Sequence, residues 1–368
     1  MREGLVKVGE LCKIRTGKLD ANASVPNGAF PFFTCSREPL RINSFSYDCE
    51  CVLIAGNGDL NVKYYNGKFD AYQRTYILEK KDNKEISIQY LFQFFCKYVE
   101  TLRRNCIGGV IKYIKLGDLT EALIPLPPIS EQQTIVSELD KINEIIDLKK
   151  TQLKDLDLLA QSIFYDMFGD PIENPKGWEI RSLKEYIKVV GGYAFKSNNF
   201  KEKGIPVLRI GNINSGEFKP TNLVFWDKDD KLSRYKILPG DMVISLTGTV
   251  GKSDYGNICI LDNSFEEYYL NQRNAKLEIQ GNIDKIYLSS ILKFDSIKAK
   301  LTNINRGVRQ ANISNKDIED LRIPLPPLSL QQSFANKIKA IESQKSAIKQ
   351  SLTEVETLLA SRMDYYFN

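Results

Sequence analysis

The residues best suited to specific recognition chemistry are arginines and amides that gather in one glycine-containing loop. Residues 303–312 hold Arg306 and Arg309 together with Gln310 and Asn312. Guanidinium and carboxamide groups form paired hydrogen bonds in a fixed geometry, and a glycine lets the backbone approach a ligand closely. Such a loop is suited to hydrogen-bonded recognition of a polar ligand. A solvated surface loop is the alternative interpretation.

A second basic loop and a repeated dipeptide extend this set of candidates. Residues 103–112 carry Arg103 and Arg104 at one end and Lys112 at the other. A Gln-Arg pair occurs twice, 199 residues apart, as Gln73-Arg74 and Gln272-Arg273. Repetition at a fixed offset indicates a role that is common to two halves of the chain.

Several common catalytic mechanisms are excluded because the chain contains no histidine. This removes Ser-His-Asp and Cys-His catalysis, His-ligated metal sites and the commonest general base. The seven cysteines form no C-x-x-C pair, which indicates free thiols in a reducing cytoplasm rather than a disulfide framework. No apolar run approaches the roughly 18 residues of a membrane span, so we expect a cytoplasmic protein. A formal net charge of +5 permits nucleic-acid binding without requiring it.

The elements that position the candidate residues follow from an internal repeat. The sequence Ile-Pro-Leu-Pro-Pro-Ile-Ser-Glu-Gln-Gln at residues 124–133 recurs as Ile-Pro-Leu-Pro-Pro-Leu-Ser-Leu-Gln-Gln at residues 323–332. Each copy leads into a stretch with helical periodicity. The two prolines and a capping box from Ser130 to Gln133 predict where the first helix starts. The chain therefore contains two copies of a domain followed by a long helix.

Both helical stretches carry apolar residues with a period of 3.5, which predicts a coiled coil. Each stretch spans about 38 residues, or on the order of 57 Å. Lys149 and Lys345 interrupt the pattern, where a lysine either fixes the helix register or lays its aliphatic stem along the seam. The predicted seam residues are Ile135, Leu139, Ile142, Ile146, Leu153 and Leu156 in the first helix, and Ile338, Ile341, Ile348, Leu352, Val355 and Leu359 in the second.

The helices need a partner because an isolated helix with an apolar seam is marginal and prone to aggregate. We expect the two copies to pair antiparallel within one chain, with one α/β domain near each end and pseudo-two-fold symmetry. Core helices of separate domains are the alternative. Within the first domain, Asn66-Gly67 between apolar stretches predicts a hairpin turn. The predicted fold class is α+β, divided into a first α/β domain (1–123), a proline motif with helix (124–170), a second α/β domain (171–322) and a second motif with helix (323–368).

This arrangement strongly resembles the specificity subunit of type I restriction-modification enzymes. The resemblance rests on the doubled proline motif, which each time follows an α/β domain and begins a long helix. It also rests on the runs Gly-Ile-Pro-Val-Leu-Arg-Ile-Gly-Asn-Ile (204–213) and Gly-Asp-Met-Val-Ile-Ser-Leu-Thr-Gly-Thr-Val-Gly (240–251), and on Asn271-Gln272-Arg273. It covers the whole chain. One departure is Leu330, where the first copy has Glu131.

The resemblance implies that the two α/β domains are target recognition domains, each reading one half of a bipartite double-stranded DNA sequence. The paired helices would act as a spacer and as the docking surface for two methyltransferase subunits, and two motor-nuclease subunits can join that complex. The chain itself would be non-catalytic and without a cofactor. S-adenosylmethionine, ATP and Mg would belong to the partner subunits. The sequence agrees, since it contains neither an Asn/Asp-Pro-Pro-aromatic motif nor a phosphate loop.

The loops and the repeated dipeptide become candidate DNA contacts under this resemblance. Arginine pairs with guanine, and asparagine or glutamine with adenine, while contacts to phosphate fix the register of the protein. A Gln-Arg pair in domains that read different bases indicates a shared role, either phosphate contact or a hydrogen bond inside the domain. The candidates are Arg306, Arg309, Gln310, Asn312, Arg103, Arg104, Lys112, Gln73, Arg74, Gln272 and Arg273.

Two functions from other classes remain as alternatives. A structural coiled-coil protein would use its end domains for protein contacts, and exchange of a domain would then leave any methylated sequence unchanged. A nuclease with unrecognised carboxylates would show metal-dependent cutting of DNA by the purified chain alone.

Overall fold

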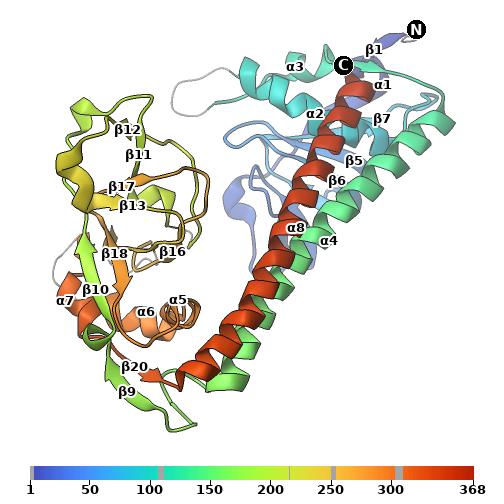
Figure 1. Ribbon diagram of the computed structural model, residues 1–368. Helices are drawn as coiled ribbons and strands as arrows, with labels where there is room; N and C mark the ends of the chain where they lie inside the picture. Colours follow the sequence, from blue (N-terminus) through green and yellow to red (C-terminus); the bar gives the residue numbers. More distant parts are fainter. Residues whose placement is uncertain (1–3, 107–111, 215, 250–253, 303–309) are drawn as a thin grey trace. The chain divides into compact units, whose positions relative to one another are not determined.

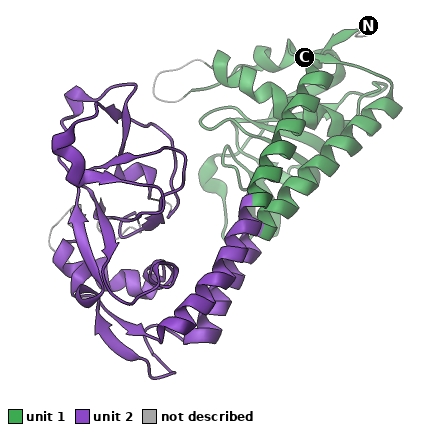
Figure 2. Cartoon of the chain, viewed as in Figure 1, with its two compact units in different colours: residues 1–152, 347–368 green, residues 153–346 purple. Residues whose placement is uncertain are grey.

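The computed structural model describes residues 4–106, 112–214, 216–249, 254–302 and 310–368 (Figure 1). The chain divides into two compact units. Unit 1 comprises residues 1–152 and 347–368, and unit 2 comprises residues 153–346 (Figure 2). Each unit therefore holds one sheet domain and a part of both long helices, α4 (Ile129–Phe168) and α8 (Leu328–Phe367).

Unit 1 is built on a six-stranded sheet in the order β2-β7-β5-β6-β3-β4. The central strand β5 alternates between two cores, because Val52 and Ile54 belong to the core under helix α2 while Cys51 and Leu53 belong to the core on the other face. A two-stranded β1–β8 ladder joins residues 5–7 to the first residues of the proline motif. The bounds are β1 (Leu5–Lys7), α1 (Val8–Leu11), β2 (Cys12–Thr16), β3 (Phe30–Phe33), β4 (Leu40–Ile42), β5 (Tyr47–Ala55), β6 (Val62–Ala71), β7 (Thr75–Lys80), α2 (Ile88–Asn105), α3 (Leu116–Thr120) and β8 (Leu123–Pro125), with a 3-10 turn at Ala21–Ala23.

Unit 2 contains two four-stranded sheets, β10-β18-β14-β16 and β12-β11-β17-β13, and the ladders β15–β19 and β9–β20. The bounds are β9 (Glu179–Ser182), β10 (Ile187–Gly191), β11 (Ile205–Leu208), β12 (Phe225–Trp226), β13 (Lys236–Ile237), β14 (Met242–Ser245), β15 (Thr247–Thr249), β16 (Ile258–Ile260), β17 (Tyr268–Leu270), β18 (Asn274–Ile279), α5 (Lys285–Leu292), α6 (Asp295–Thr302), β19 (Gln310–Asn312), α7 (Asn315–Glu319) and β20 (Arg322–Leu325). Four 3-10 turns lie at Leu183–Glu185, Ser197–Asn199, Ile210–Asn212 and Asp230–Tyr235.

The two units share the pairing of their central strands. β2-β7-β5 in unit 1 corresponds to β10-β18-β14 in unit 2, and every pair in both sets is antiparallel. In both units one further strand joins in parallel, β3 to β6 and β11 to β17. The β1–β8 ladder corresponds to β9–β20. The repeat in the sequence is therefore a repeat of topology.

The long helices pack against each other in antiparallel fashion within each unit, as predicted from the sequence. In unit 1, Glu138 of α4 bonds to Arg362 of α8, and Lys150 lies 3.5 Å from Glu356. In unit 2, the Phe164 ring lies 5.6 Å from the Phe334 ring. Partner numbers on α8 fall as those on α4 rise, so the helices run in opposite directions. Each helix has 40 residues, close to the expected length.

The predicted seam residues all lie at buried or half-buried positions of the two helices. Ile135, Leu139, Ile142 and Ile146 are buried in unit 1, and Ile338 and Ile341 are buried in unit 2. The other six are half-buried, namely Leu153, Leu156, Ile348, Leu352, Val355 and Leu359. Their role in spacing or docking stays a prediction.

The proline motif is anchored in the same way in both units. The side-chain oxygen of Gln132 accepts from the Ser87 amide at 2.9 Å, and that of Gln331 accepts from the Asp284 amide at 2.8 Å. Each glutamine also donates to the carbonyl of the motif's first consecutive proline, Pro127 or Pro326. Both glutamines are fully buried. The first helix begins at Ile129, so Ser130 lies inside the helix and not at the predicted capping position.

The predicted Asn66-Gly67 hairpin turn is wrong. Both residues lie inside β6, where Asn66 pairs with Glu50 and Gly67 pairs with Cys49 of β5. Gly67 has φ of 132°, a conformation that glycine adopts without strain, so the strand continues through it. The connection between β5 and β6 lies at residues 56–61 instead.

Candidate nucleic-acid interface

The first Gln-Arg pair forms the tip of a tight turn in unit 1. The Thr75 amide donates to the Tyr72 carbonyl at 2.8 Å, which closes a four-residue turn with Gln73 and Arg74 at its centre. The turn is held from both sides, because the Gln73 amide donates to the Leu19 carbonyl at 2.9 Å and the Arg74 carbonyl accepts from the Gly56 amide at 2.8 Å. Both side chains are exposed.

The second pair occupies the same turn in unit 2. The Asn274 amide donates to the Asn271 carbonyl at 2.9 Å, with Gln272 and Arg273 at the centre. The Gln272 amide donates to the Tyr193 carbonyl at 2.9 Å, and the Arg273 carbonyl accepts from the Leu246 amide at 2.8 Å. These side chains are also exposed. The three backbone hydrogen bonds that fix the turn are therefore duplicated.

In unit 1, residues 112–114, which precede the proline motif, lie directly beside the strand extension that holds this turn. The Gly56 carbonyl accepts from the Ile114 amide at 3.0 Å, and the Gly58 amide donates to the Lys112 carbonyl at 3.0 Å. Asn57 and Tyr113 form a bridge between these segments. The extension of β5 therefore lies between the turn and residues 112–114, and brings Arg74 and Lys112 to one edge of the sheet.

The same arrangement recurs in unit 2. The Leu246 carbonyl accepts from the Ile313 amide at 2.8 Å, and β15 pairs with β19 so that Thr247 lies opposite Asn312. We call this region the turn edge. It consists of residues 56–58, 72–74 and 112–114 in unit 1, and residues 246–249, 271–273 and 310–313 in unit 2.

The predicted basic residues of unit 1 differ in how far they are engaged inside the protein. Arg103 donates to the Leu60 carbonyl at 2.6 Å and bonds to Glu100, so its guanidinium is occupied. Arg104 is exposed and donates to the Thr101 hydroxyl at 3.2 Å. Lys112 is exposed at the turn edge.

An ion pair adds a fixed charge close to this edge. Arg37 donates to Asp59 at 2.9 Å, and this hydrogen bond together with the positive charge of Arg37 lowers the pKa of the Asp59 carboxyl. Arg103 lies 3.7 Å from the same carboxylate. Asp59 therefore stays ionised and is compensated by two arginines.

Unit 2 offers amide and aromatic groups beside its turn. Asn312 is exposed, and Tyr193, whose ring lies 5.0 Å from Phe195, is 38% exposed. Arg306 and Arg309 lie outside the described residues. Gln310 opens strand β19 within the turn edge.

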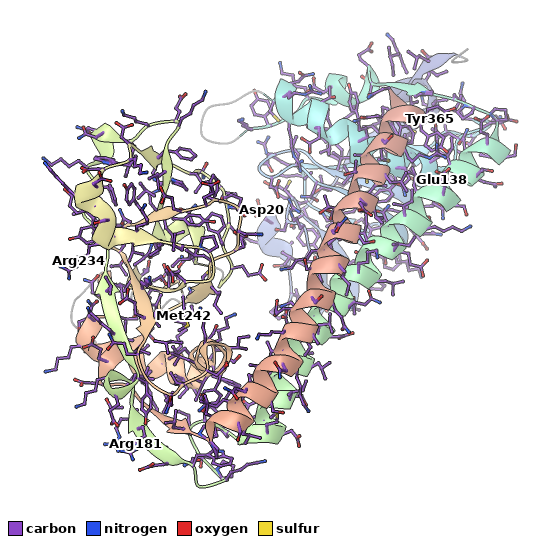
Figure 3. The ribbon with its side chains drawn as sticks, viewed as in Figure 1. Asp20, Glu138, Arg181, Arg234, Met242 and Tyr365 are labelled. Carbon is purple, nitrogen blue, oxygen red and sulfur yellow. The ribbon has the colours of Figure 1, made fainter. Side chains whose placement is uncertain are left out.

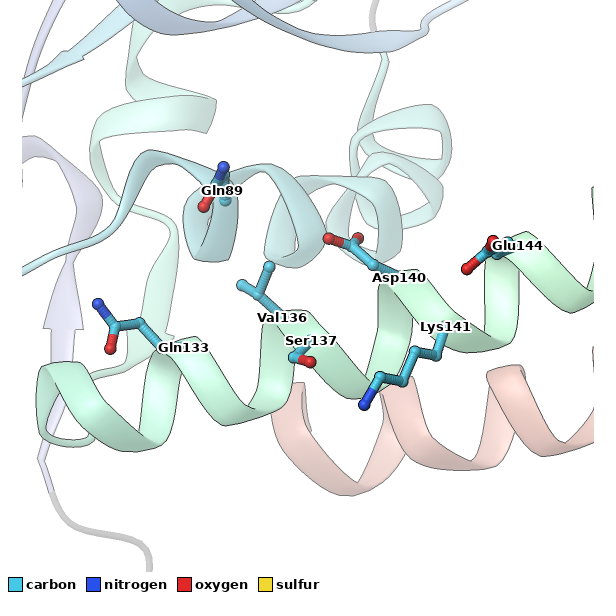
Figure 4. Close-up of a pocket in the computed structure, with 7 residues that line it drawn as sticks. All are labelled: Gln89, Gln133, Val136, Ser137, Asp140, Lys141 and Glu144. Atoms are coloured by element: carbon cyan, nitrogen blue, oxygen red, sulfur yellow. The ribbon is translucent and has the colours of Figure 1, made fainter.

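A shallow polar groove lies on α4 in unit 1, away from the turn edge. It has a volume of about 390 Å³, and the Asp140 carboxylate at its side accepts from Gln93 of α2 at 2.7 Å. Figure 4 shows the lining residues, Gln89, Gln133, Val136, Ser137, Asp140, Lys141 and Glu144. Its mixed charges suit a polar protein surface more than a polyanion.

Among the described residues, no helix is both long and apolar enough to cross a lipid bilayer. The same residues contain no cluster of three or more side chains arranged to hold a metal ion.

Two sheet domains with matching turn edges, joined to a pair of long helices, define a protein with two similar heads. The family model for the type I restriction modification DNA specificity domain matches residues 4–158 and 175–357. The chain belongs to this family and is the DNA specificity subunit of a type I restriction-modification system. A specificity subunit of this kind is itself non-catalytic.

The chain is similar to several proteins of this class. It is 25% identical to the type I restriction enzyme EcoDI specificity subunit of Escherichia coli, over 94% of this chain and 83% of that protein. It is 26% identical to the MjaVIII specificity subunit of Methanocaldococcus jannaschii, over 79% of this chain and 72% of that protein. The solved S subunit from M. genitalium has the same fold, with a TM-score of 0.62, 16% identity and coverage of 99% of this chain and 96% of that chain.

Proposed function

We propose that each unit reads one half of a bipartite DNA target through its turn edge. The observation that carries this proposal is the duplication of the edge, with an identical Gln-Arg pair on each turn and different residues on the strands beside it. Two copies of one binding geometry with different side chains are what two unlike half-sites require. The positively charged, amide-rich composition suits phosphate and base edges.

The helix pair sets the spacing of the two heads and docks two methyltransferase subunits. Leu159 in unit 2 and Leu358 in unit 1 support this part of the proposal, because they occupy equivalent repeat positions and are 47% and 48% exposed. Each unit thus presents an exposed leucine at the same position of the repeat. Two motor-nuclease subunits join this complex. S-adenosylmethionine, ATP and Mg are bound by the partner subunits.

An exchange of one recognition sheet tests the proposal. Residues 4–123 are replaced by the matching domain of a family member with a different target, while residues 124–368 are kept. The chain is expressed with its methyltransferase subunits, and the methylated bases are mapped in genomic DNA. We expect one half-site to change while the other half-site and the gap between them stay the same.

Two results would contradict different parts of the proposal. An unchanged target would show that the sheet of unit 1 does not read DNA. A changed gap would show that the helices do not set the spacing. The reciprocal exchange of residues 171–322 is the control, and it should change only the other half-site.

A further inference from the structure

The repeat of this chain has conserved two different kinds of polar residue between its halves. Gln132 and Gln331 are fully buried and bond to equivalent backbone groups, so their duplication is explained by the fold. The fold does not explain the duplication of the Gln-Arg pairs in this way. Within the described parts of the chain, their side chains make no hydrogen bond or ion pair, although the backbone beneath them is held by three duplicated hydrogen bonds.

A hydrogen bond inside the domain therefore does not account for the repeated side chains. Nor does the turn itself require arginine, because the backbone alone makes the bonds that close it. Arg103 shows how a structural arginine looks in this protein, with its guanidinium bonded to a carbonyl and a carboxylate. Arg74 and Arg273 are instead exposed, and no side-chain hydrogen bond or ion pair to the residues that the structure describes engages them. An exposed cation on a rigid support is the arrangement of a preorganised ligand contact.

We propose that Arg74 and Arg273 are matched contacts to the DNA phosphates of the two half-sites and take no part in discriminating bases. This inference rests on the proposed function, in which the two units read different sequences. The same side chain on the same turn would read the same base in both half-sites. The phosphodiester backbone is the part of a duplex that two unlike half-sites share.

Base reading then falls to the neighbouring positions that are equivalent in place but different in chemistry. Asn57 bridges Tyr113 in unit 1, and Thr247 lies opposite Asn312 at the corresponding place in unit 2. Tyr113 is 38% exposed and Asn312 is exposed. The phosphate contact made by each arginine fixes the distance of these side chains from the duplex.

The test uses the full chain in complex with its methyltransferase subunits. The probes are a duplex that carries the target mapped for the wild-type complex and a scrambled duplex of the same length. Binding is measured from 50 to 200 mM salt for Arg74→Ala, for Arg273→Ala and for the double variant. Each phosphate contact contributes about 0.9 to the slope of log affinity against log salt. Over this fourfold range, salt should therefore weaken binding by each single variant about 3.5-fold less than binding by wild type, and binding by the double variant about 12-fold less.

Further variants separate phosphate contact from base reading. Arg74→Lys should keep most of the salt dependence, because a lysine also neutralises a phosphate, and the methylated sequence should be the same in every variant. Lys13→Ala and Lys188→Ala are matched controls. Both lysines are exposed and occupy equivalent positions, Lys13 on β2 opposite Glu79 and Lys188 on β10 opposite Glu278. They lie outside the turn, so their loss should leave the salt slope unchanged.

Two outcomes overturn the inference. A methylated sequence that changes at one position in Arg74→Ala or Arg74→Lys would make this arginine a base reader. A salt slope equal to that of wild type in the double variant would show that neither arginine touches DNA. Failure of the proposed function looks different, because the wild-type complex would then bind the target and scrambled duplexes equally.

Discussion

Gln132 and Gln331 show how single buried residues tie the proline motif to each sheet domain. Each uses both its oxygen and its nitrogen, and Gln132 also donates to the Glu85 carbonyl at 2.9 Å. A neighbouring pair of tyrosines adds to this anchor, since the Tyr90 hydroxyl donates to Pro125 and the Tyr287 hydroxyl donates to Pro324. The direction in which each long helix leaves its domain therefore depends on a few buried hydrogen bonds.

Replacement of Gln331 by alanine should lower the free energy of unfolding of unit 2 by about 2 to 3 kcal/mol. The change leaves the partly buried Asp284 amide and the buried Pro326 carbonyl without these partners, and such groups are costly to bury unpaired. Trp178 and Trp226 both lie in unit 2, so urea unfolding followed by tryptophan fluorescence reports on this unit.

The neighbouring Gln332 supplies the matched control. It is exposed, so Gln332→Ala should change the free energy of unfolding by less than about 0.5 kcal/mol. Equal destabilisation by the two variants would show that the buried hydrogen bonds are not the cause.

At the scale of the elements, α4 and α8 are joined by polar contacts as well as by the seam. In unit 1 the Tyr366 hydroxyl donates to Glu138 at 2.6 Å, and Arg362 bonds to the same carboxylate. Figure 3 labels Glu138 on α4 and Tyr365, the residue before Tyr366, on α8. In unit 2, Lys345 lies 2.8 Å from Asp157 of the other helix.

Lys345 is more buried than Arg362 or Glu138, and nearby carboxylates compensate its charge. Burial lowers the pKa of Lys345, but the hydrogen bonds to Asp157 and Glu342 outweigh it and hold the pKa above its ordinary value. Because Lys345 reaches a carboxylate on the partner helix, this lysine links the register of the two helices in unit 2. Lys149 is half-buried in the seam of unit 1.

Replacement of Glu138 by glutamine should weaken unit 1 at neutral pH and reduce its sensitivity to acid. The hydrogen bond from Arg362, with a second from Tyr366, lowers the pKa of the Glu138 carboxyl from its ordinary value. A lowered folded-state pKa adds stability above the unfolded pKa, and this stability is lost as the pH falls through the folded value. The side chains of Arg362 and Glu138 are 39% and 31% exposed, so solvent screening limits the effect to about 0.5 to 1 kcal/mol.

Hydrogen exchange of helix α2 and strand β5, measured at pH 7, 5.5 and 3.5, provides the readout. The difference between wild type and Glu138→Gln should be largest at pH 7 and should shrink at pH 3.5. Glu144→Gln, at an exposed position of the same helix, is the control and should match wild type throughout. A difference that grows toward low pH would contradict the assignment.

At the scale of the whole molecule, the last residues of the chain complete the core of the first unit. Met363 and Phe367 of α8 belong to the same buried cluster as Ile54, Phe94 and Ile135. The Phe367 ring lies 5.3 Å from Tyr90. Unit 1 therefore cannot complete its core until Met363 and Phe367 have been made.

Replacement of Phe367 by alanine should destabilise unit 1 by about 3 kcal/mol or more, because it leaves a cavity between α8 and α2. Hydrogen exchange should speed up in α2 and β5, although these elements lie more than 260 residues earlier in the sequence. Exchange in β14 and β18 should stay the same, since unit 2 has a core of its own.

Tyr365 serves as the control for this prediction. It lies two residues from Phe367 and is 69% exposed, so Tyr365→Ala should leave exchange in unit 1 unchanged. Faster exchange in unit 2 alone after Phe367→Ala would contradict the assignment of the C-terminal segment to unit 1.

The repeat, the two long helices, their seam and the mixture of strands and helices in each domain could all be predicted from the sequence. These features depend on periodicity and on motifs that lie within a few residues of each other, so neighbouring side chains carry the signal. It also singled out the Gln-Arg pairs and the loops before the proline motifs. The Asn66-Gly67 turn failed because a strong local hairpin signal was overridden by the long ladder between β5 and β6.

Only the tertiary structure decided which of these residues lie together. Arg74 and Lys112 are 38 residues apart, and they share an edge because the extension of β5 forms hydrogen bonds to both segments. Burial was also decided by the tertiary structure. Gln132 and Gln133 are adjacent residues of the same type, but only Gln132 is buried. Strand pairing between distant segments depends on the packing of the whole core, and no local pattern encodes it. The turn edge is therefore a product of the fold, built from residues that the sequence had already marked.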